Sequence, residues 1–168
     1  MEKEIEIFPS LFYKYDKSPH WIWYDIHGDQ SKKAELPELV KQLIEEGVLH
    51  EEEYVSGLDM VSVDGSLSEV EAEKKTIELM QKGVSLIYQG AISYKSGNVK
   101  FKGRPDLLEK CEGGSKFGNY FYTPIEIKNS GKCEKPEYKM QLMFYGMILE
   151  KIQGYFPKEA LFINRIKI

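Results

Sequence analysis

Two carboxyl groups and one lysine stand in the sequence at a spacing that can bring them together on a β-sheet. GRPDLL (103–108) is followed by IEIK (125–128), so that Asp106 precedes Glu126 by twenty residues. Side chains two apart on a strand share a face, so Glu126 and Lys128 project together while the isoleucines beside them enter the core. Neighbouring antiparallel strands would then bring Asp106 next to Glu126.

Two carboxylates with one ammonium group suit a hard divalent cation acting on a phosphodiester. Mg²⁺ favours a few carboxylates together with water and substrate phosphate oxygens. Such a metal lowers the pKa of bound water, and a lysine can orient or deprotonate that water or stabilise developing negative charge. For E-x-K alone, an ordinary surface pair of Glu and Lys is the simpler interpretation. The preceding Pro-Asp and the apolar residues around Glu126 favour a built site, because charged residues are rarely buried without a reason.

The helices that must position these residues follow from periodicity and end signals. A helix begins at about Pro37, and its apolar stripe at three- and four-residue steps includes His50, which therefore faces inward. A second helix spans about 67–82, and a third runs over 136–153. The end signals are a capping box at Ser66 and Glu69 or at Ser68 and Glu71, and the glycines Gly83 and Gly154.

The pattern changes to strands between the second and third helices. Residues 84–94 and 98–110 predict a hairpin. A glycine-rich connection over 111–119 leads to a third strand at 120–129, and 160–168 predicts a final strand. The order is helix, helix, three antiparallel strands, helix, strand, which is a mixed α/β domain.

An aromatic segment precedes this core. Residues 8–29 contain both tryptophans and predict an irregular or short helical arm packed on the core. We expect one domain over residues 1–168, with an N-terminal arm over 1–35 and the core over 36–168. A second metal site in the arm is an alternative to a purely aromatic surface there; its candidate ligands are His20, Asp25, His27 and Asp29.

The stretches GRPDLL and EIK together resemble the PD-(D/E)XK nuclease superfamily. The resemblance implies a restriction-endonuclease-like core of a helix, three antiparallel strands, a helix and a further strand, and this matches the order above. Three more stretches resemble the RecB-like exonuclease branch, which includes helicase-associated nuclease domains and exonucleases of CRISPR adaptation. These are QLMFY (141–145) for its Q-x-x-x-Y element, GVLHE (47–51) for its G-x-x-H-E element, and SPHWIWYD (18–25) for its opening.

The resemblance, which covers most of residues 18–168, implies a role for each matching residue. Asp106 and Glu126 would be metal ligands with the Ile127 carbonyl as a third, and Lys128 would be the catalytic lysine. His50 would complete the metal shell, with Glu51 as the second choice. Gln141 and Tyr145 would lie one helical turn apart and would orient the site or contact the DNA backbone. The simpler interpretations are a core histidine, a solvated glutamate, a buried hydrogen-bonding glutamine and a core tyrosine.

The sequence departs from the RecB-like pattern in its cysteines. Many members hold an iron–sulfur cluster with one early and three late cysteines, but the early position here is Ser18, and no cysteine follows Cys133. We therefore expect Mg²⁺ or Mn²⁺ and no iron–sulfur cluster, and we interpret Cys111 and Cys133 as loop thiols. Related proteins often carry further domains where this chain stops, so the resemblance leaves two alternatives: a stand-alone minimal nuclease, or part of a protein with additional domains or with a helicase- or CRISPR-type partner.

Composition bounds the class of protein. The 168 residues are 42% hydrophobic and 30% charged, which excludes a disordered chain. Two cysteines exclude a disulfide framework and an all-cysteine metal site. No apolar run reaches the ~20 residues that span a bilayer, and the acidic N-terminus does not resemble a signal peptide. These features predict a cytoplasmic protein without a membrane partner.

Charge is uneven along the chain. Residues 1–93 hold 9 basic and 19 acidic side chains, whereas residues 94–168 hold 14 and 8. All three of Asp106, Glu126 and Lys128 fall in the basic half. Such asymmetry can mark a surface that binds a polyanion, although charge alone favours the simpler interpretation of a solvated surface with acidic helices.

These observations predict a metal-dependent deoxyribonuclease with a role in DNA repair or defence. We expect an exonuclease or an enzyme that prefers single strands, with single-stranded DNA or duplex ends as its partner. The exposed aromatics of the arm could stack on unpaired bases, or they could pack in the core. Two alternatives stay open: an inactive nucleic-acid-binding module on the same fold, and a hydrolase of another phosphate ester.

Overall fold

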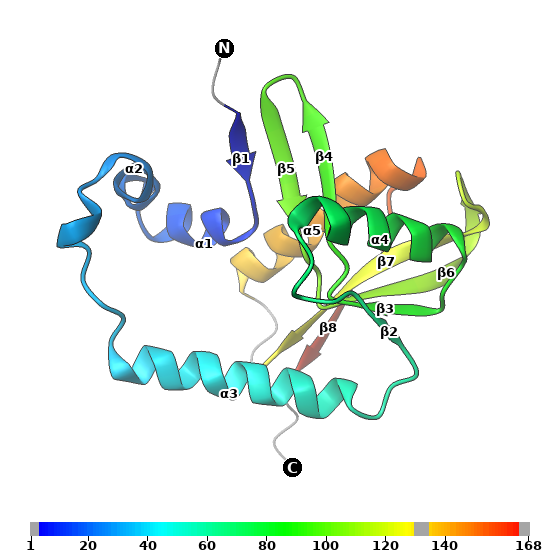
Figure 1. Ribbon diagram of the computed structural model, residues 1–168, viewed down its shortest axis with the longest axis horizontal. Helices are drawn as coiled ribbons and strands as arrows, with labels where there is room; N and C mark the ends of the chain where they lie inside the picture. The colour runs from blue at the N-terminus through cyan, green and yellow to red at the C-terminus, as the bar shows by residue number, and fades with distance from the viewer. Residues whose placement is uncertain (1–3, 130–134, 165–168) are drawn as a thin grey trace.

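The chain forms a mixed α/β structure with five α-helices and two mixed sheets over the residues that the computed structural model describes, 4–129 and 135–164 (Figure 1). This agrees with the fold class expected from the sequence. In chain order the elements are β1 (Ile5–Ile7), α1 (Ser10–Lys17), α2 (Pro19–His27), the 3₁₀ turn η1 (Gln30–Lys32), α3 (Glu38–Val55), β2 (Val61–Ser62), α4 (Glu69–Gln81), β3 (Leu86–Tyr88), β4 (Ile92–Ser96), β5 (Val99–Gly103), β6 (Leu107–Ser115), β7 (Gly118–Lys128), α5 (Pro136–Gln153) and β8 (Leu161–Asn164).

The larger sheet has the strand order β2-β3-β6-β7-β8. Its central strands β3, β6 and β7 are antiparallel to one another. Strand β8, which follows α5 in the chain, pairs with β7 in parallel. The smaller sheet has the order β1-β5-β4 and projects from the body as an upright hairpin with β1 at its edge (Figure 1). In the larger sheet, the antiparallel strands β3, β6 and β7 are followed along the chain by α5 and then by β8.

Two hydrophobic cores pack against the larger sheet. The main core joins α4 and α5 to one face of the sheet, with Leu108 and Tyr122 contributed by the strands. A smaller core collects Leu107, Ile125 and Ile127 with Val55 at the end of α3. Because Ile125 and Ile127 enter this smaller core, Glu126 between them points to the opposite face of the sheet, toward α5. This alternation decides which side of the sheet carries Glu126.

The helix ends predicted from sequence are confirmed closely. The Ser68 hydroxyl and the Glu71 carboxylate form the capping box of α4, so the second of the two predicted boxes is the one present. Helix α5 covers the predicted residues 136–153 and ends at Gly154, whose φ of 70° needs glycine. Among the described helices, none combines the length and the apolar character needed to cross a membrane.

Two predicted strands are each broken in the structure. The strand expected over 84–94 divides into β3 and β4, because Gln89 adopts a φ of 53° and the chain turns there out of one sheet into the other. The strand expected over 98–110 divides into β5 and β6 at Arg104-Pro105-Asp106, where the proline offers no N–H to a ladder. The hairpin turn at Lys95–Asn98 was predicted correctly, since β4 and β5 pair in antiparallel on either side of it.

The connection predicted over 111–119 is wrong. Strand β6 continues to Ser115, with a register shift between Glu112 and Ser115, and the turn is confined to the residues before β7. Cys111 consequently lies on a strand rather than in a loop, and it is half-buried. Cys133 and residues 165–168 of the predicted last strand lie outside the described residues.

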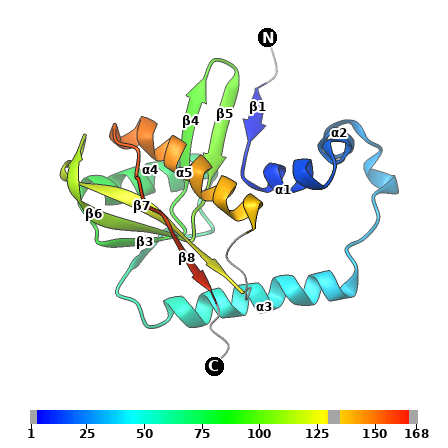
Figure 2. The same cartoon turned by 180° about the vertical axis from the view of Figure 1, so that it is seen from behind.

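The apolar stripe of α3 does not face a core along its length. Leu39 and Leu43 are both more than half exposed, and only Val55 of this helix is buried. The sheet does not extend along the whole helix: the end of β7 lies against the middle of α3, and the N-terminal turns of α3 run past the body (Figures 1 and 2). The expected packing of the arm is likewise only partial, since Phe12 of α1 packs on Phe144 while α2 has no buried residue.

Helix α5 is fixed to β7 by the fully buried side-chain amide of Gln153. The Gln153 side chain accepts a hydrogen bond from the Tyr122 N–H at 2.7 Å and donates to the carbonyls of Tyr122 and Tyr155 at 3.0 Å each. We expect Gln153→Ala to lower the free energy of unfolding by about 3 kcal/mol, because it leaves a buried backbone N–H unpaired and a cavity. Denaturant titration measures this; exposed Lys139→Ala on the same helix should change it by less than about 0.5 kcal/mol. Equal effects of the two variants would contradict the prediction.

Candidate functional site

The register of β6 and β7 brings the two predicted carboxylates together. Leu107 lies opposite Ile125, so the preceding Asp106 lies opposite Glu126 on the same face of the sheet. The Ile127 N–H donates a hydrogen bond to Asp106 Oδ2 at 2.7 Å, which holds this carboxylate against β7. Asp106 is only 9% exposed and Glu126 is fully buried. Buried carboxylates of this kind need compensating partners.

Lys128 supplies the nearest positive charge. Its Nζ lies 2.5 Å from Glu126 Oε2, and it also lies over the Tyr138 ring at 5.8 Å from the ring centre. The Lys128 side chain is 23% exposed, whereas that of Glu126 is 1% exposed. The lysine therefore stands between the buried carboxylate and the surface, where it can meet a ligand that Glu126 alone could not reach.

Helix α5 contributes a second donor from one of its inner turns. The Gln141 amide donates to Glu126 Oε2 at 2.8 Å and to the Tyr145 hydroxyl at 3.0 Å. The Tyr145 hydroxyl in turn donates to the Arg104 carbonyl at 3.4 Å. Gln141 and Tyr145 thus lie one turn apart on one face of α5, as expected. Their hydrogen bonds connect α5 to β7, which carries Glu126, and to the segment before β6, which carries Asp106.

Sequence reasoning missed the role of Gly103 in seating Tyr145. A Cβ at Gly103 would lie 2.4 Å from Tyr145 Cε1, so only glycine lets the tyrosine ring pack against β5. The signal was present in the sequence, because Gly103 opens the GRPDLL stretch. The glycine is needed because the ring of Tyr145, 42 residues further along the chain, packs closely against it, and this contact is visible only in the fold.

The structure links Glu51 to this cluster through Gln89, and it shows no such link for His50 among the described residues. Gln89 donates to Glu51 Oε1 at 2.6 Å and lies 3.5 Å from Asp106 Oδ1, so it bridges α3 to Asp106. His50 is half-buried, and its Nε2 has no hydrogen-bond partner among the described residues. Gln89 was not predicted, since its position depends on the left-handed backbone that ends β3.

The electrostatics of the cluster disfavour further negative charge. Burial, together with the charge of Glu126, raises the pKa of Asp106 to about 7, against the opposing effects of Lys128 and the Ile127 N–H. Burial also raises the pKa of Glu126. Burial pulls the pKa of Lys128 down, but the charges of Glu126 and Asp106 outweigh it and raise that pKa overall. A cation added next to Asp106 and Glu126 would relieve the repulsion between them.

The donor set fits a magnesium-like cation better than a soft metal. Glu126 Oε1 is buried without a hydrogen-bond partner in the described part of the chain, so it has a lone pair available for a ligand. Within residues 4–129 and 135–164, the His, Cys, Asp and Glu side chains form no group of three or more that could hold a metal ion. Mg²⁺ does not require one, because it binds through one or two carboxylates and keeps several waters.

The candidate metal ligands of the arm are engaged in other contacts. The Asp25 carboxylate binds Lys14 Nζ at 2.6 Å and Lys33 Nζ at 2.7 Å. Asp29 accepts a hydrogen bond from the Ser31 N–H at 3.1 Å and so caps η1. The structure therefore gives these two carboxylates structural roles. Trp23 of the same arm is 55% exposed, which keeps an aromatic surface there.

Comparisons with protein-family models, with curated proteins and with solved structures found no match to this chain. The function of this chain is therefore inferred from the residues of the cluster and from their geometry.

Proposed function

We propose that this chain is a metal-dependent nuclease that hydrolyses DNA phosphodiester bonds. The observation that carries the proposal is the buried pair of Asp106 and Glu126 with Lys128 Nζ 2.5 Å from Glu126. Two carboxylates of raised pKa beside an ammonium group are costly to fold, so the cluster calls for a function that repays the cost.

The arrangement of elements supports a restriction-endonuclease-like core. In this interpretation the core is α3, the antiparallel strands β3, β6 and β7, helix α5, and β8 parallel to β7. The PD-(D/E)XK resemblance seen in the sequence places its acidic residues and lysine on the second and third strands of that core. Asp106 directly precedes β6, and Glu126 and Lys128 lie at the end of β7.

Each residue of the cluster has a role in this proposal. Asp106 and Glu126 would hold Mg²⁺ or Mn²⁺ together with the Ile127 carbonyl, and the metal would supply an acidified water and charge neutralisation at the phosphate. Lys128 orients the attacking water and stabilises negative charge on the phosphate. Gln141 holds the Glu126 carboxylate in place from α5, and Tyr145 fixes Gln141.

The direct test is cleavage of end-labelled single-stranded and duplex DNA in Mg²⁺, Mn²⁺ or chelator. We expect cleavage in either metal and none in chelator. A chain that binds DNA but cleaves it under no metal would be the inactive binding module. A chain that hydrolyses small phosphodiesters but shows no salt-dependent DNA binding would be a hydrolase of another phosphate ester. Either outcome would overturn the proposal.

Metal affinity separates the two candidates that α3 offers to the metal shell. The geometry favours Glu51, because Gln89 links it to Asp106, over His50. We expect Glu51→Gln to weaken Mg²⁺ or Mn²⁺ binding by about 10-fold, as for residues that support a metal ligand, and His50→Asn to change it little. Calorimetric titration measures both.

The matched control is Glu52→Gln, which removes the same charge from the exposed side of α3. If Glu52→Gln weakens metal binding as much as Glu51→Gln does, the effect is long-range charge and not position. If His50→Asn gives the larger loss, the histidine is the ligand, as the RecB-like resemblance implies.

A further inference from the structure

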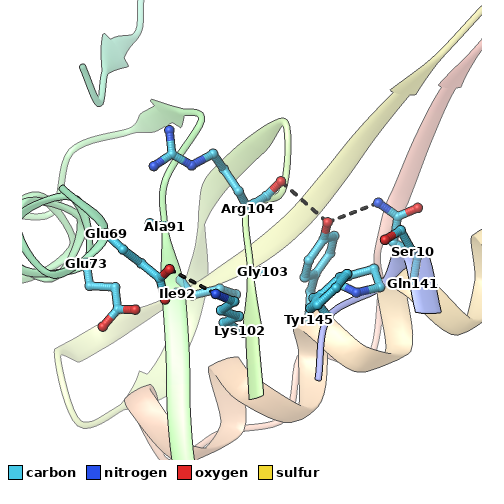
Figure 3. A pocket seen from close by; sticks show the side chains of 12 residues that line it. Ser10, Glu69, Glu73, Ala91, Ile92, Lys102, Gly103, Arg104, Gln141 and Tyr145 are labelled. Carbon is cyan, nitrogen blue, oxygen red and sulfur yellow. Dashed lines mark hydrogen bonds and ion pairs between the residues drawn. The ribbon is translucent and has the colours of Figure 1, made fainter. Parts of the chain in front are cut away.

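A cavity of about 430 Å³ is lined by Arg104, Gln141 and Tyr145 (Figure 3). It shares Gln141 and Tyr145 with the candidate site. Gln141 is the residue whose amide donates to Glu126, so a ligand in the cavity lies one side chain from the buried carboxylate. A cavity of this size is within the range that holds a small molecule or one residue of a polymer.

The cavity has one apolar wall and one charged wall. Phe8 and Pro9, from the segment between β1 and α1, face it together with Ile92 and the Tyr145 ring. Glu69 and Glu73 of α4 also line it, but both are engaged: Lys100 Nζ lies 2.8 Å from a carboxylate oxygen of each. Lys102 is paired in turn with Glu6 at 2.8 Å and with Glu69 at 3.0 Å. These ion pairs neutralise the glutamates of α4 that line the cavity.

Arg104 differs from the other cations of the cavity. Within the described residues no hydrogen bond or ion pair engages its guanidinium, while its carbonyl accepts the Tyr145 hydroxyl. Figure 3 shows the Arg104 carbonyl turned toward Tyr145 and Gln141, while the Arg104 guanidinium extends away from them, on the side of the Glu69–Lys102 pair. A guanidinium is always charged and presents a fork that matches two oxygens of a phosphate.

A second cavity extends the same surface on the other side of Gln141. It has a volume of about 300 Å³ and shares Pro9, Ser10 and Gln141 with the first. Tyr13 and Tyr138 line it with Lys135, which lies 5.2 Å from the centre of the Tyr138 ring. Aromatic rings beside a cation are the combination that holds single-stranded nucleic acid. The second cavity is thus lined by two tyrosines, one lysine and the Glu137 carboxylate, and it meets the first cavity at Gln141.

We propose that the Arg104 cavity binds the terminal nucleotide of a nucleic-acid strand, with the Arg104 guanidinium on its terminal phosphate and the sugar or base against Phe8, Pro9 and Tyr145. The strand then passes Gln141 and continues over Tyr138. This inference rests on the proposed function and deepens it, because it makes a phosphorylated strand end the preferred substrate.

The test is equilibrium binding of short single-stranded oligonucleotides in chelator, where no cleavage occurs. The probes carry a 5′-phosphate, a 3′-phosphate or hydroxyls at both ends. We expect the wild type to bind one of the two phosphorylated probes about 10-fold more tightly than the hydroxyl probe, since a charged hydrogen-bonded pair contributes at this level. The preferred probe identifies which end the cavity takes.

Arg104→Ala should bind all three probes alike, and its salt dependence should fall by about 0.7 in log–log slope, the value for one phosphate contact on a single strand. Arg104→Lys keeps the charge but loses the fork, so it should recover only part of the preference. Lys74→Ala, an exposed cation of α4 outside the cavity, is the matched control and should retain the full preference. Circular dichroism of each variant verifies folding.

The inference is overturned if the wild type does not distinguish the probes, or if Arg104→Ala keeps the preference, or if Lys74→Ala loses as much as Arg104→Ala. These results are separate from those of the cleavage assay. A protein that prefers a phosphorylated end through Arg104 but cleaves no DNA would support the nucleotide pocket and contradict the proposed nuclease. A protein that cleaves DNA without any such preference would support the nuclease and contradict the nucleotide pocket.

Discussion

Lys128→Ala is expected to reduce metal-dependent DNA cleavage by about 10³-fold, the range associated with loss of a positioned catalytic group. The ammonium is the only cation that the described residues place against Glu126, at 2.5 Å, and it stands on the exposed side of that carboxylate. Its loss removes the group that orients the water and stabilises charge at the phosphate. End-labelled DNA in Mg²⁺ measures the rate, and DNA binding should fall much less than cleavage.

A structural contribution of Lys128 can be separated from a catalytic one. The alanine variant leaves Glu126 with Gln141 as a donor but without a counter-charge, so some loss of stability is expected. Added ethylammonium or propylammonium should restore part of the cleavage rate in Lys128→Ala if the ammonium acts in the reaction. Wild-type cleavage in the variant would contradict the assignment, and a rate restored by stabilising additives without amine would make the role purely structural.

Asp106→Asn is expected to abolish cleavage and yet to stabilise the metal-free protein. The asparagine keeps an oxygen for the Ile127 N–H, which now donates to Asp106 at 2.7 Å, but it removes a negative charge that metal binding requires. In chelator at pH 8 the same change should raise the melting temperature by several degrees, because it removes a buried charge beside Glu126. Mg²⁺ should raise the melting temperature of the wild type and not that of the variant.

The pH dependence of this stabilisation has a definite sign. Burial and Glu126 raise the pKa of Asp106 from 3.8 to about 7 in the folded state. A carboxyl group with a raised folded-state pKa stabilises the fold at low pH and loses this contribution as the pH rises through 7. The advantage of Asp106→Asn should therefore be small at pH 4 and grow to a maximum above pH 7. Thermal melts in chelator from pH 4 to 8 measure it, and an advantage that shrinks with pH would contradict the pKa shift.

Local signals in the sequence were reliable where a helix or turn is specified by its own residues. Helix α5 was predicted with its bounds because Pro136 suits a first turn and Gly154 takes the left-handed conformation that ends it. The capping box of α4 was predicted because Ser68 and Glu71 act on backbone groups within one turn. Such interactions span only three or four residues, so a sequence window contains all the information they need.

Predictions failed where the answer depended on contacts far along the chain. Periodicity made 84–94 one strand, but the chain turns at Gln89, and the Gly90 backbone that follows lies against Leu108 and Thr76, where a larger side chain would not fit. Periodicity also made the apolar stripe of α3 a buried face, whereas the helix runs beyond the sheet that would cover it. An apolar pattern indicates which side of an element prefers burial, and it does not indicate whether a partner reaches that side.

The sequence by itself determined the composition of the candidate site, because strand alternation makes Glu126 and Lys128 share a face and a three- to four-residue helical period makes Gln141 and Tyr145 share another. Only the tertiary structure decided how these faces meet. The β6–β7 register put Asp106 opposite Glu126, and the absence of a side chain at Gly103 let Tyr145 come close. The turn at Gln89 brought Glu51 toward Asp106. Each of these depends on packing between segments separated by tens of residues, and such packing is set by shape and burial in the folded chain.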